Sequence, residues 1–114
     1  MEIYDFSGKH YICSFKEIAL PTPLLLKEIV MDALTLCGAT ILKYDYHLFN
    51  NNAITFVFLL SESHCTVHTY PEYQSLFIDA FTCGNNFDVQ RFHDLLTWRF
   101  KPRELPQYQI INRN

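Results

Sequence analysis

The segment from Leu59 to Tyr73 concentrates the residue types that do chemistry. It reads L-L-S-E-S-H-C-T-V-H-T-Y-P-E-Y, so imidazole, thiol and carboxylate groups surround Ser63. A second thiol follows one predicted strand later, in Phe81-Thr82-Cys83-Gly84. An imidazole titrates near neutral pH, and an activated hydroxyl or thiol attacks carbonyl carbon. This density of reactive side chains predicts a catalytic centre in the middle of the chain.

Two other interpretations of these residues are open. In the first they are structural: Ser63 starts a strand, His68 is half buried with its ring nitrogens hydrogen bonded, and Cys83 fills a small gap. In the second they bind a metal, because imidazoles and thiols are suitable ligands. The candidate ligands are His64, Cys65, His68 and Cys83. Residues 64 and 65 point to opposite faces of an extended strand, so the four side chains should not converge, and we expect no metal.

Short apolar runs separated by turn residues predict six strands. These cover residues 10–15, 40–49, 53–60, 64–70, 75–82 and 105–111. Asn50-Asn51-Asn52 is typical of a turn, because asparagine tolerates left-handed backbone conformations, so the strands on either side should form a hairpin. Pro106 has no amide proton to donate to a neighbour, which favours an edge position for the last strand.

Two further segments have the spacing of amphipathic helices. The first starts at Pro23 after a cap by Thr22. The second follows a cap at Asn86 or Asp88 and ends before Pro102. Its apolar face should hold Phe92, Leu95, Leu96 and Trp98. The order is β-α-β-β followed by β-β-α-β, which predicts an α+β two-layer sandwich with a largely antiparallel sheet and two helices on one face.

Composition limits the possible functions. A chain of 114 residues, of which 49% are hydrophobic, is long enough for one domain covering residues 1–114. The 9 basic and 12 acidic residues give a net charge of −3 without a basic cluster, so we expect no nucleic-acid partner. The apolar run Ile54–Leu60 is shorter than the about 20 residues that span a bilayer, and the acidic N-terminus lacks the layout of a secretory signal. We therefore expect a cytoplasmic protein without a membrane partner and with four free thiols.

The string L-S-E-S-H-x-x-x-H-T-Y-P-E-Y and the D-x-F-T-C-G of Asp79–Gly84 resemble the prokaryotic S-adenosylmethionine decarboxylase proenzymes, a pyruvoyl-dependent family. Gly8-Lys9-His10, Gly38-Ala39-Thr40 and His47-x-Phe49 fit the same pattern. The resemblance therefore covers nearly the whole chain, and its central motif combines a serine, a histidine and a cysteine at the spacing of that family.

This resemblance implies that the chain makes its own cofactor. The backbone would break between Glu62 and Ser63, leaving a β chain (1–62) and an α chain (63–114) that begins with a pyruvoyl group. The hydroxyl of Ser63 would attack the preceding carbonyl carbon, a base would remove the α-proton, and the product would hydrolyse to a ketone with loss of ammonia. The pyruvoyl group would then condense with the substrate amine and accept the electrons released with carbon dioxide.

The resemblance also assigns roles in proton transfer. His68 matches the processing residue, and Cys83 matches the proton donor in catalysis. Thr55 stands where the family commonly has a serine that supports processing; it keeps the hydroxyl, while its methyl group restricts the rotamers. Strict alternation places Ser63 and His68 on opposite faces of a strand, so we expect the strand to begin after Ser63 or to bend there.

For substrate binding the resemblance implies an aromatic and acidic pocket. Phe49 would stack on adenine, and the carboxylate of Glu72 would accept hydrogen bonds from the ribose hydroxyls. Tyr70 stands where many relatives have tryptophan. The sulfonium of the substrate would be attracted to aromatic rings or to the carboxylate freed at Glu62.

The expected partners are S-adenosylmethionine and a second copy of the chain. A small core leaves little room for a deep cavity, and the family places its two active sites at the interface of a homodimer. The expected reaction forms carbon dioxide and decarboxylated S-adenosylmethionine, the aminopropyl donor of polyamine synthesis. Two alternatives remain: a pyruvoyl-dependent arginine or ornithine decarboxylase of the same fold, or a regulatory homologue that is never cleaved.

Overall fold

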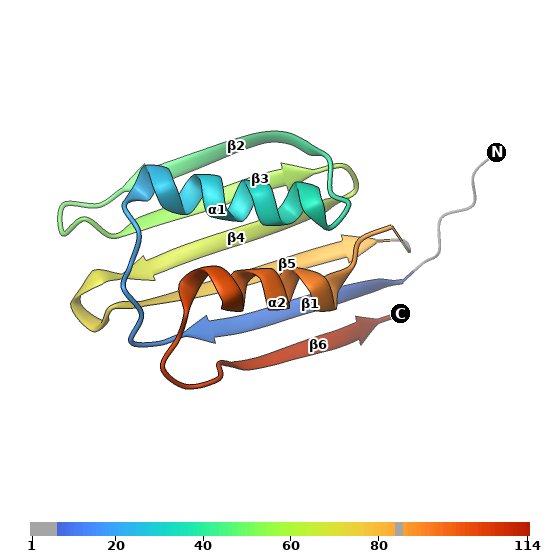
Figure 1. Cartoon of the computed structure of the whole chain (residues 1–114). Helices are drawn as coiled ribbons and strands as arrows, with labels where there is room; N and C mark the ends of the chain where they lie inside the picture. Colours follow the sequence, from blue (N-terminus) through green and yellow to red (C-terminus); the bar gives the residue numbers. More distant parts are fainter. Residues whose placement is uncertain (1–6, 84–85) are drawn as a thin grey trace.

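The computed structural model describes residues 7–83 and 86–114 (Figure 1). The elements follow the predicted order. They are β1 (Gly8–Phe15), α1 (Pro23–Leu36), β2 (Ile41–Leu48), β3 (Ile54–Leu60), β4 (Ser63–Tyr70), the 3₁₀ turn η1 (Pro71–Tyr73), β5 (Ser75–Cys83), α2 (Val89–Phe100) and β6 (Gln107–Arg113). None of the described helices is long and apolar enough to cross a membrane.

The six strands form one sheet in the order β2-β3-β4-β5-β1-β6, and each strand is antiparallel to its neighbours. The predicted hairpin of β2 and β3 is present, with a register shift between Ile41 and Lys43. β6 lies at one edge, and Pro106 immediately precedes it, so the proline leaves the ladder of hydrogen bonds intact.

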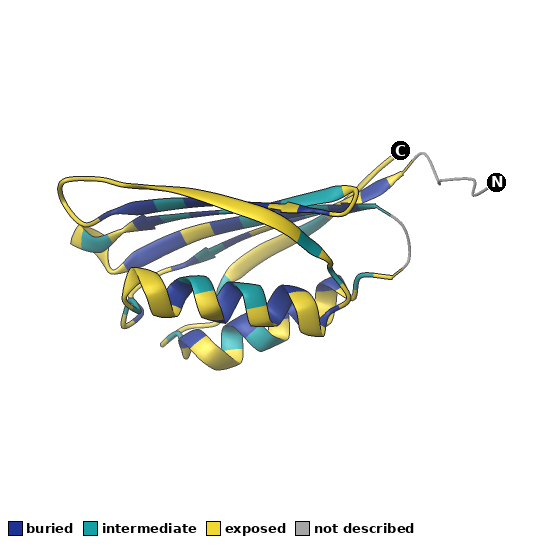
Figure 2. Cartoon of the chain, turned by 90° about the horizontal axis from the view of Figure 1, so that it is seen from above, coloured by how far each residue is buried: buried dark blue, intermediate teal, exposed yellow. Residues whose placement is uncertain are grey.

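Both helices pack on the same face of the sheet, which confirms the predicted α+β two-layer sandwich (Figures 1 and 2). The core lies between the two layers. Its largest fully buried side chains include Tyr11, Leu26, Leu34, Phe15, Phe58, Leu76, Ile78, Phe92 and Leu96. Alternate residues of each strand point away from the helices and form a second face, which we call the open face. No helix among residues 7–83 and 86–114 covers the open face (Figure 2).

Local signals in the sequence explain where the helices begin. Thr22 caps α1, because its hydroxyl oxygen accepts a hydrogen bond from the backbone N–H of Leu25 at 3.3 Å. Asp88, and not Asn86, caps α2, because its carboxylate accepts from the N–H of Arg91 at 3.0 Å. α2 ends as predicted, with Lys101 in the left-handed conformation.

One predicted core residue of α2 is wrong. Phe92 and Leu96 are buried and Leu95 is partly buried, but Trp98 is 69% exposed. The buried positions of α2 recur every three or four residues up to Phe100, and Trp98 lies between two of them on the outer side of the helix. The large apolar ring of Trp98 suggested burial, but the helical period places this residue on the solvent side of α2.

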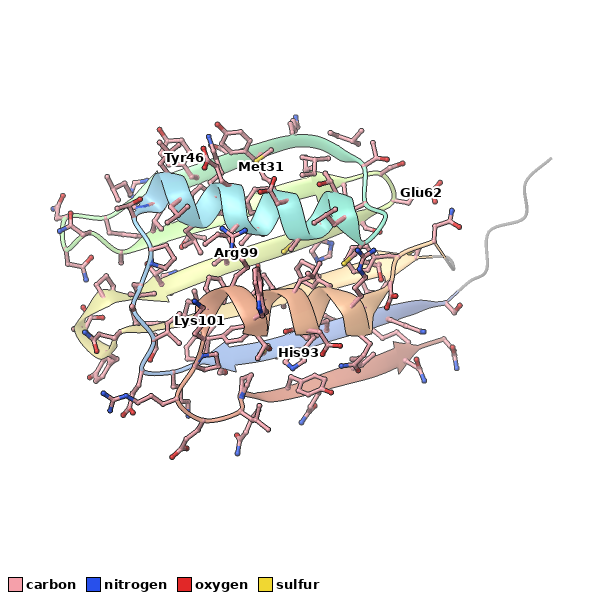
Figure 3. The ribbon with its side chains drawn as sticks, viewed as in Figure 1. Met31, Tyr46, Glu62, His93, Arg99 and Lys101 are labelled. Atoms are coloured by element: carbon pink, nitrogen blue, oxygen red, sulfur yellow. The ribbon has the colours of Figure 1, made fainter. Side chains whose placement is uncertain are left out.

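A buried polar pair links α2 to the sheet. The hydroxyl of Tyr11 in β1 lies 2.7 Å from Nδ1 of His93, whose ring stacks on Tyr108 of β6 at a centroid distance of 3.6 Å. His93 projects from α2 toward these strands (Figure 3). Burial raises the pKa of the Tyr11 phenol and lowers the pKa of His93, so the phenol donates to a neutral imidazole. This pair fixes the position of α2.

Candidate active site

The predicted cleavage point lies in the tight turn that joins β3 to β4. Leu60 pairs with Ser63, so Ser61 and Glu62 form the loop, and Glu62 is exposed at the end of the sheet (Figure 3). The backbone of Glu62 has φ 64°, a left-handed conformation that residues other than glycine adopt at a cost of about 1 kcal/mol. The peptide bond predicted to break is thus flanked by strained backbone.

The hydroxyl of Ser63 is held directly beside Cys83. Its oxygen accepts a hydrogen bond from the backbone N–H of Cys83 at 3.2 Å, which joins the first residue of β4 to the last residue of β5. Cys83 is half-buried, and its side chain belongs to the open face, as does that of Phe81. All four cysteines are free, as expected from the sequence. The structure therefore brings together two of the predicted site residues.

A second group of predicted residues surrounds His68. The hydroxyl oxygen of Thr55 lies 2.6 Å from Nδ1 of His68, and the two residues are directly opposite each other on β3 and β4. Phe49 and Tyr70 contact the imidazole ring edge to face, with centroid distances of 6.1 and 4.6 Å. One nitrogen of the ring is therefore hydrogen bonded, while aromatic side chains fix its plane.

Glu72 lies at the same end of the sheet as His68. It belongs to the turn η1, and its carboxylate accepts a hydrogen bond from the side chain of Asn51 at 3.2 Å. Phe49 flanks the same loop, so an acidic and an aromatic side chain occur close to Tyr70. A cavity of about 410 Å³ opens beside Tyr70, and neither Phe49 nor Glu72 is part of its lining, which consists of Lys16, Glu17, Tyr70, Tyr73, Ser75 and Phe77.

The two groups are far apart within one chain. Ser63 and His68 are five residues apart along β4, which corresponds to about 17 Å. Their side chains also point to opposite faces, since Ser63 has the same alternation as the buried Cys65 and Val67. β4 is regular from Ser63 onward, so the expectation that the strand begins later or bends there is wrong. Within one protomer His68 does not reach Ser63.

Cys83 and His64, the residue after Ser63, adjoin a cavity on the open face. It has a volume of about 460 Å³, and its lining consists of Ser7, Gly8, His64, Phe81, Cys83, Arg113 and Asn114. Gly8 pairs with Cys83 on one side and with Arg113 on the other. A Cβ atom at Gly8 would lie 2.4 Å from Cζ of Phe81, so a glycine is required for this ring to lie across β1. The ring of Phe81 fills the space that a side chain at residue 8 would take, and the guanidinium of Arg113 lies 5.3 Å from its centroid.

The four candidate metal ligands do not converge. Cys65 is fully buried toward the helices, whereas His64 next to it faces the open side, as the alternation predicted. Within residues 7–83 and 86–114, no group of three or more histidine, cysteine, aspartate or glutamate side chains is arranged to hold a metal ion.

Sequence reasoning missed a polar group at the centre of the open face. Asp79 accepts from the hydroxyl of Thr66, and Nε2 of His10 lies 3.1 Å from its second carboxylate oxygen. These residues come from three adjacent strands, β4, β5 and β1. Alternation alone would have placed each on the open face, but their meeting depends on the pairing of β1 with β5, which no local signal specifies.

These observations define an enzyme-like site on a two-layer α+β sheet, with the Cys83 thiol at one end of the open face, the His68 imidazole toward the other end, and the Ser63 hydroxyl held by the backbone N–H of Cys83 with its side chain toward the helices. A family model described as S-adenosylmethionine decarboxylase matches residues 9–114. The chain therefore belongs to the S-adenosylmethionine decarboxylase family, as the sequence motifs indicated.

Individual relatives agree with this assignment. The S-adenosylmethionine decarboxylase proenzyme of Archaeoglobus fulgidus is 31% identical over 90% of this chain and 95% of its own length. The corresponding proenzyme of Symbiobacterium thermophilum is 38% identical over 75% of this chain and 67% of its own length. The crystal structure of the adenosylmethionine decarboxylase from Aquifex aeolicus superposes with a TM-score of 0.82 over 94% of this chain and 90% of that one, at 23% identity. This structural match shows the same fold.

Proposed function

We propose that the chain is a proenzyme that cleaves itself between Glu62 and Ser63 and then decarboxylates S-adenosylmethionine. The observation that carries the proposal is the hydroxyl of Ser63, which is held by the N–H of Cys83 directly after a strained residue in a tight turn. Family membership supports the same conclusion. It does not favour a pyruvoyl-dependent arginine or ornithine decarboxylase, or a regulatory protein.

Cleavage requires a nucleophile, a base and release of the peptide nitrogen. The oxygen of Ser63 forms a bond to the carbonyl carbon of Glu62, the C–N bond breaks, and the nitrogen takes up a proton. A base then removes the α-proton of residue 63, and the ester oxygen leaves with the β chain as a carboxylate. Water hydrolyses the remaining enamine to a ketone and ammonia. Relief of the left-handed strain at Glu62 favours the first step.

Residue 63 is suited to carry a pyruvoyl group. The hydroxyl oxygen leaves with the β chain during cleavage, which frees the N–H of Cys83 to donate a hydrogen bond to a carbonyl oxygen of the pyruvoyl group or of the substrate. The cavity of about 460 Å³ at this end of the sheet offers room for a substrate beside His64 and Cys83. The pyruvoyl group supplies an acceptor for the electrons released when carbon dioxide leaves. Cys83 donates a proton to the substrate carbon that has lost its carboxylate.

We further propose that each active site uses two protomers of a homodimer. Ser63 and His68 lie about 17 Å apart in one chain, so the processing imidazole has to come from another copy. If two open faces stack about a twofold axis, the partner's His68 lies at the end of the sheet where β4 begins with Ser63, and the reverse holds at the second site. The open face also carries exposed apolar side chains suited to burial against a second sheet. They are Ile12, Val57, Leu59, Phe77 and Ile111.

The same arrangement supplies a substrate pocket. Phe49 and Tyr70 from one protomer provide aromatic faces for adenine, and the carboxylate of Glu72 accepts hydrogen bonds from the ribose hydroxyls. All three lie at the His68 end of the sheet. In a dimer of stacked open faces they meet residue 63 of the partner. The acidic and aromatic character of this end suits a substrate that carries a sulfonium charge.

The decisive experiment is denaturing electrophoresis with intact-mass measurement on the wild type and on Ser63→Ala. We expect two wild-type fragments separated between Glu62 and Ser63, and a single chain for the alanine variant. Treatment of the wild type with borohydride and an amine should add mass at the N-terminus of the α chain only. A wild-type chain that stays intact would make the regulatory alternative the better explanation.

The substrate is tested separately by release of labelled carbon dioxide. We expect S-adenosylmethionine to be decarboxylated in preference to arginine and ornithine, giving the aminopropyl donor for polyamine synthesis. A preference for either basic amino acid would overturn the substrate assignment and leave the self-cleavage proposal in place.

A further inference from the structure

We propose that His64 returns a proton to Cys83 after each decarboxylation, so that the thiol is ready for the next substrate. This inference rests on the proposed function. Decarboxylation replaces a carboxylate with hydrogen and therefore consumes one proton per turnover. Cys83 supplies that proton and is left as a thiolate, so the proton has to be replaced from solvent through some group beside the thiol.

The position of His64 suits that task. It follows Ser63 directly on β4, and its side chain faces the open side of the sheet. His64 and Cys83 line the same cavity of about 460 Å³. His64 pairs with Phe81 across β4 and β5, and Cys83 is two residues beyond Phe81 on the same face. Such diagonal neighbours are about 7–8 Å apart between their Cα atoms, a gap that a long side chain bridges.

The imidazole of His64 is also free to exchange protons. Its ring stacks on Phe81 with a centroid distance of 5.9 Å and an interplanar angle of 28°, so its face is covered while its nitrogens remain at the edge. No side-chain hydrogen bond joins His64 to another of the residues at positions 7–83 and 86–114, whereas His10, His68 and His93 each have a partner.

The proton transfers balance with solvent as the only other reactant. The imidazolium of His64 gives a proton to the thiolate of Cys83, and the neutral imidazole regains one from a hydronium ion of the solvent, which becomes water. In the proposed dimer of stacked open faces the partner sheet would lie over this cavity and slow the access of hydronium to the thiol, so a relay through His64 speeds its reprotonation.

The test compares His64→Gln with the wild type, with kcat expressed per chain that carries the pyruvoyl group by intact mass. We expect kcat to fall by about tenfold or more at pH 8, with little change in KM. The loss should shrink as the pH is lowered, because hydronium then reprotonates the thiolate directly. Imidazole added to the buffer should restore turnover in proportion to its concentration, and sodium chloride at equal ionic strength should not.

His10→Gln is the matched control, because His10 also contacts Phe81, at 5.9 Å, but does not line the cavity. It should keep the wild-type kcat and pH profile. Equal kcat and equal pH profiles for His64→Gln and the wild type would overturn the inference, as would a loss that imidazole does not restore. A wild type that neither cleaves nor releases carbon dioxide would instead contradict the proposed function.

Discussion

Mixing two inactive variants tests whether each active site is shared between protomers. Ser63→Ala removes the nucleophile, and His68→Ala removes the processing imidazole. Neither variant should cleave alone. Ser63 and His68 lie about 17 Å apart on one strand, and proton transfer needs contact at about 3 Å, so no side-chain rotation closes the gap within a chain. Cleavage in the mixture therefore requires the partner's imidazole.

The expected yield follows from symmetry. With equal amounts and random pairing, about half of the dimers contain one chain of each kind. Such a dimer has one site that combines an intact Ser63 with an intact histidine from the partner, and one site that has lost both. About half of the His68→Ala chains should therefore be cleaved, and none of the Ser63→Ala chains.

Coexpression of the two variants, followed by denaturing electrophoresis and intact mass, measures this yield directly. Each fragment is assigned to its parent by the mass of the substitution. Circular dichroism on each variant alone checks that it folds. Cleavage of His68→Ala in the absence of the second variant would refute the reasoning, and so would a mixture of folded chains that produces no fragments.

Three further outcomes follow from particular contacts. Gly8→Ala should still fold, with a loss of about 1–2 kcal/mol in the free energy of unfolding, as urea unfolding will show. Its turnover should also fall, because the new Cβ displaces Phe81, and an activity assay measures this. Thr55→Val should slow self-cleavage about tenfold, and Thr55→Ser should not, as a time course of fragments will show. Burial lowers the pKa of His93, so the unfolded chain binds the proton first and stability falls as the pH drops below about 6.5. The urea midpoint at pH 7.5 and 5.5 measures this, and His93→Gln should flatten the change.

Local signals made much of the fold predictable. The caps at Thr22 and Asp88 and the turn Asn50–Asn52 lie at the predicted boundaries, because a side chain hydrogen bonds the backbone within a few residues. Alternation also correctly separated His64 from Cys65, since neighbours on a strand point to opposite faces. These features depend on the nearest neighbours in the chain, which a single sequence records.

The arrangement of the site was harder to predict from the sequence. Motif spacing placed Ser63, His68 and Cys83 in one short stretch, yet the structure joins only Ser63 to Cys83, through the pairing of β4 with β5. The pairing of β1 with β5, which connects His10 to Asp79, spans most of the chain. Strand order and register of this kind arise from the packing of the whole sheet, so no window of residues contains them.

The length of β4 itself explains why the proposed site needs two chains. An eight-residue strand carries Ser63 at one end and Tyr70 at the other, so an extended sheet necessarily separates the nucleophile from the imidazole and the aromatic pocket. A twofold axis through the middle of the open face reverses the strand direction in the partner and superimposes opposite ends. Self-cleavage then depends on association, so the fraction of cleaved chain should fall when the proenzyme is diluted below its dimer dissociation constant. In this arrangement a monomer retains an intact backbone, and the reactive ketone forms only where a second sheet already covers it.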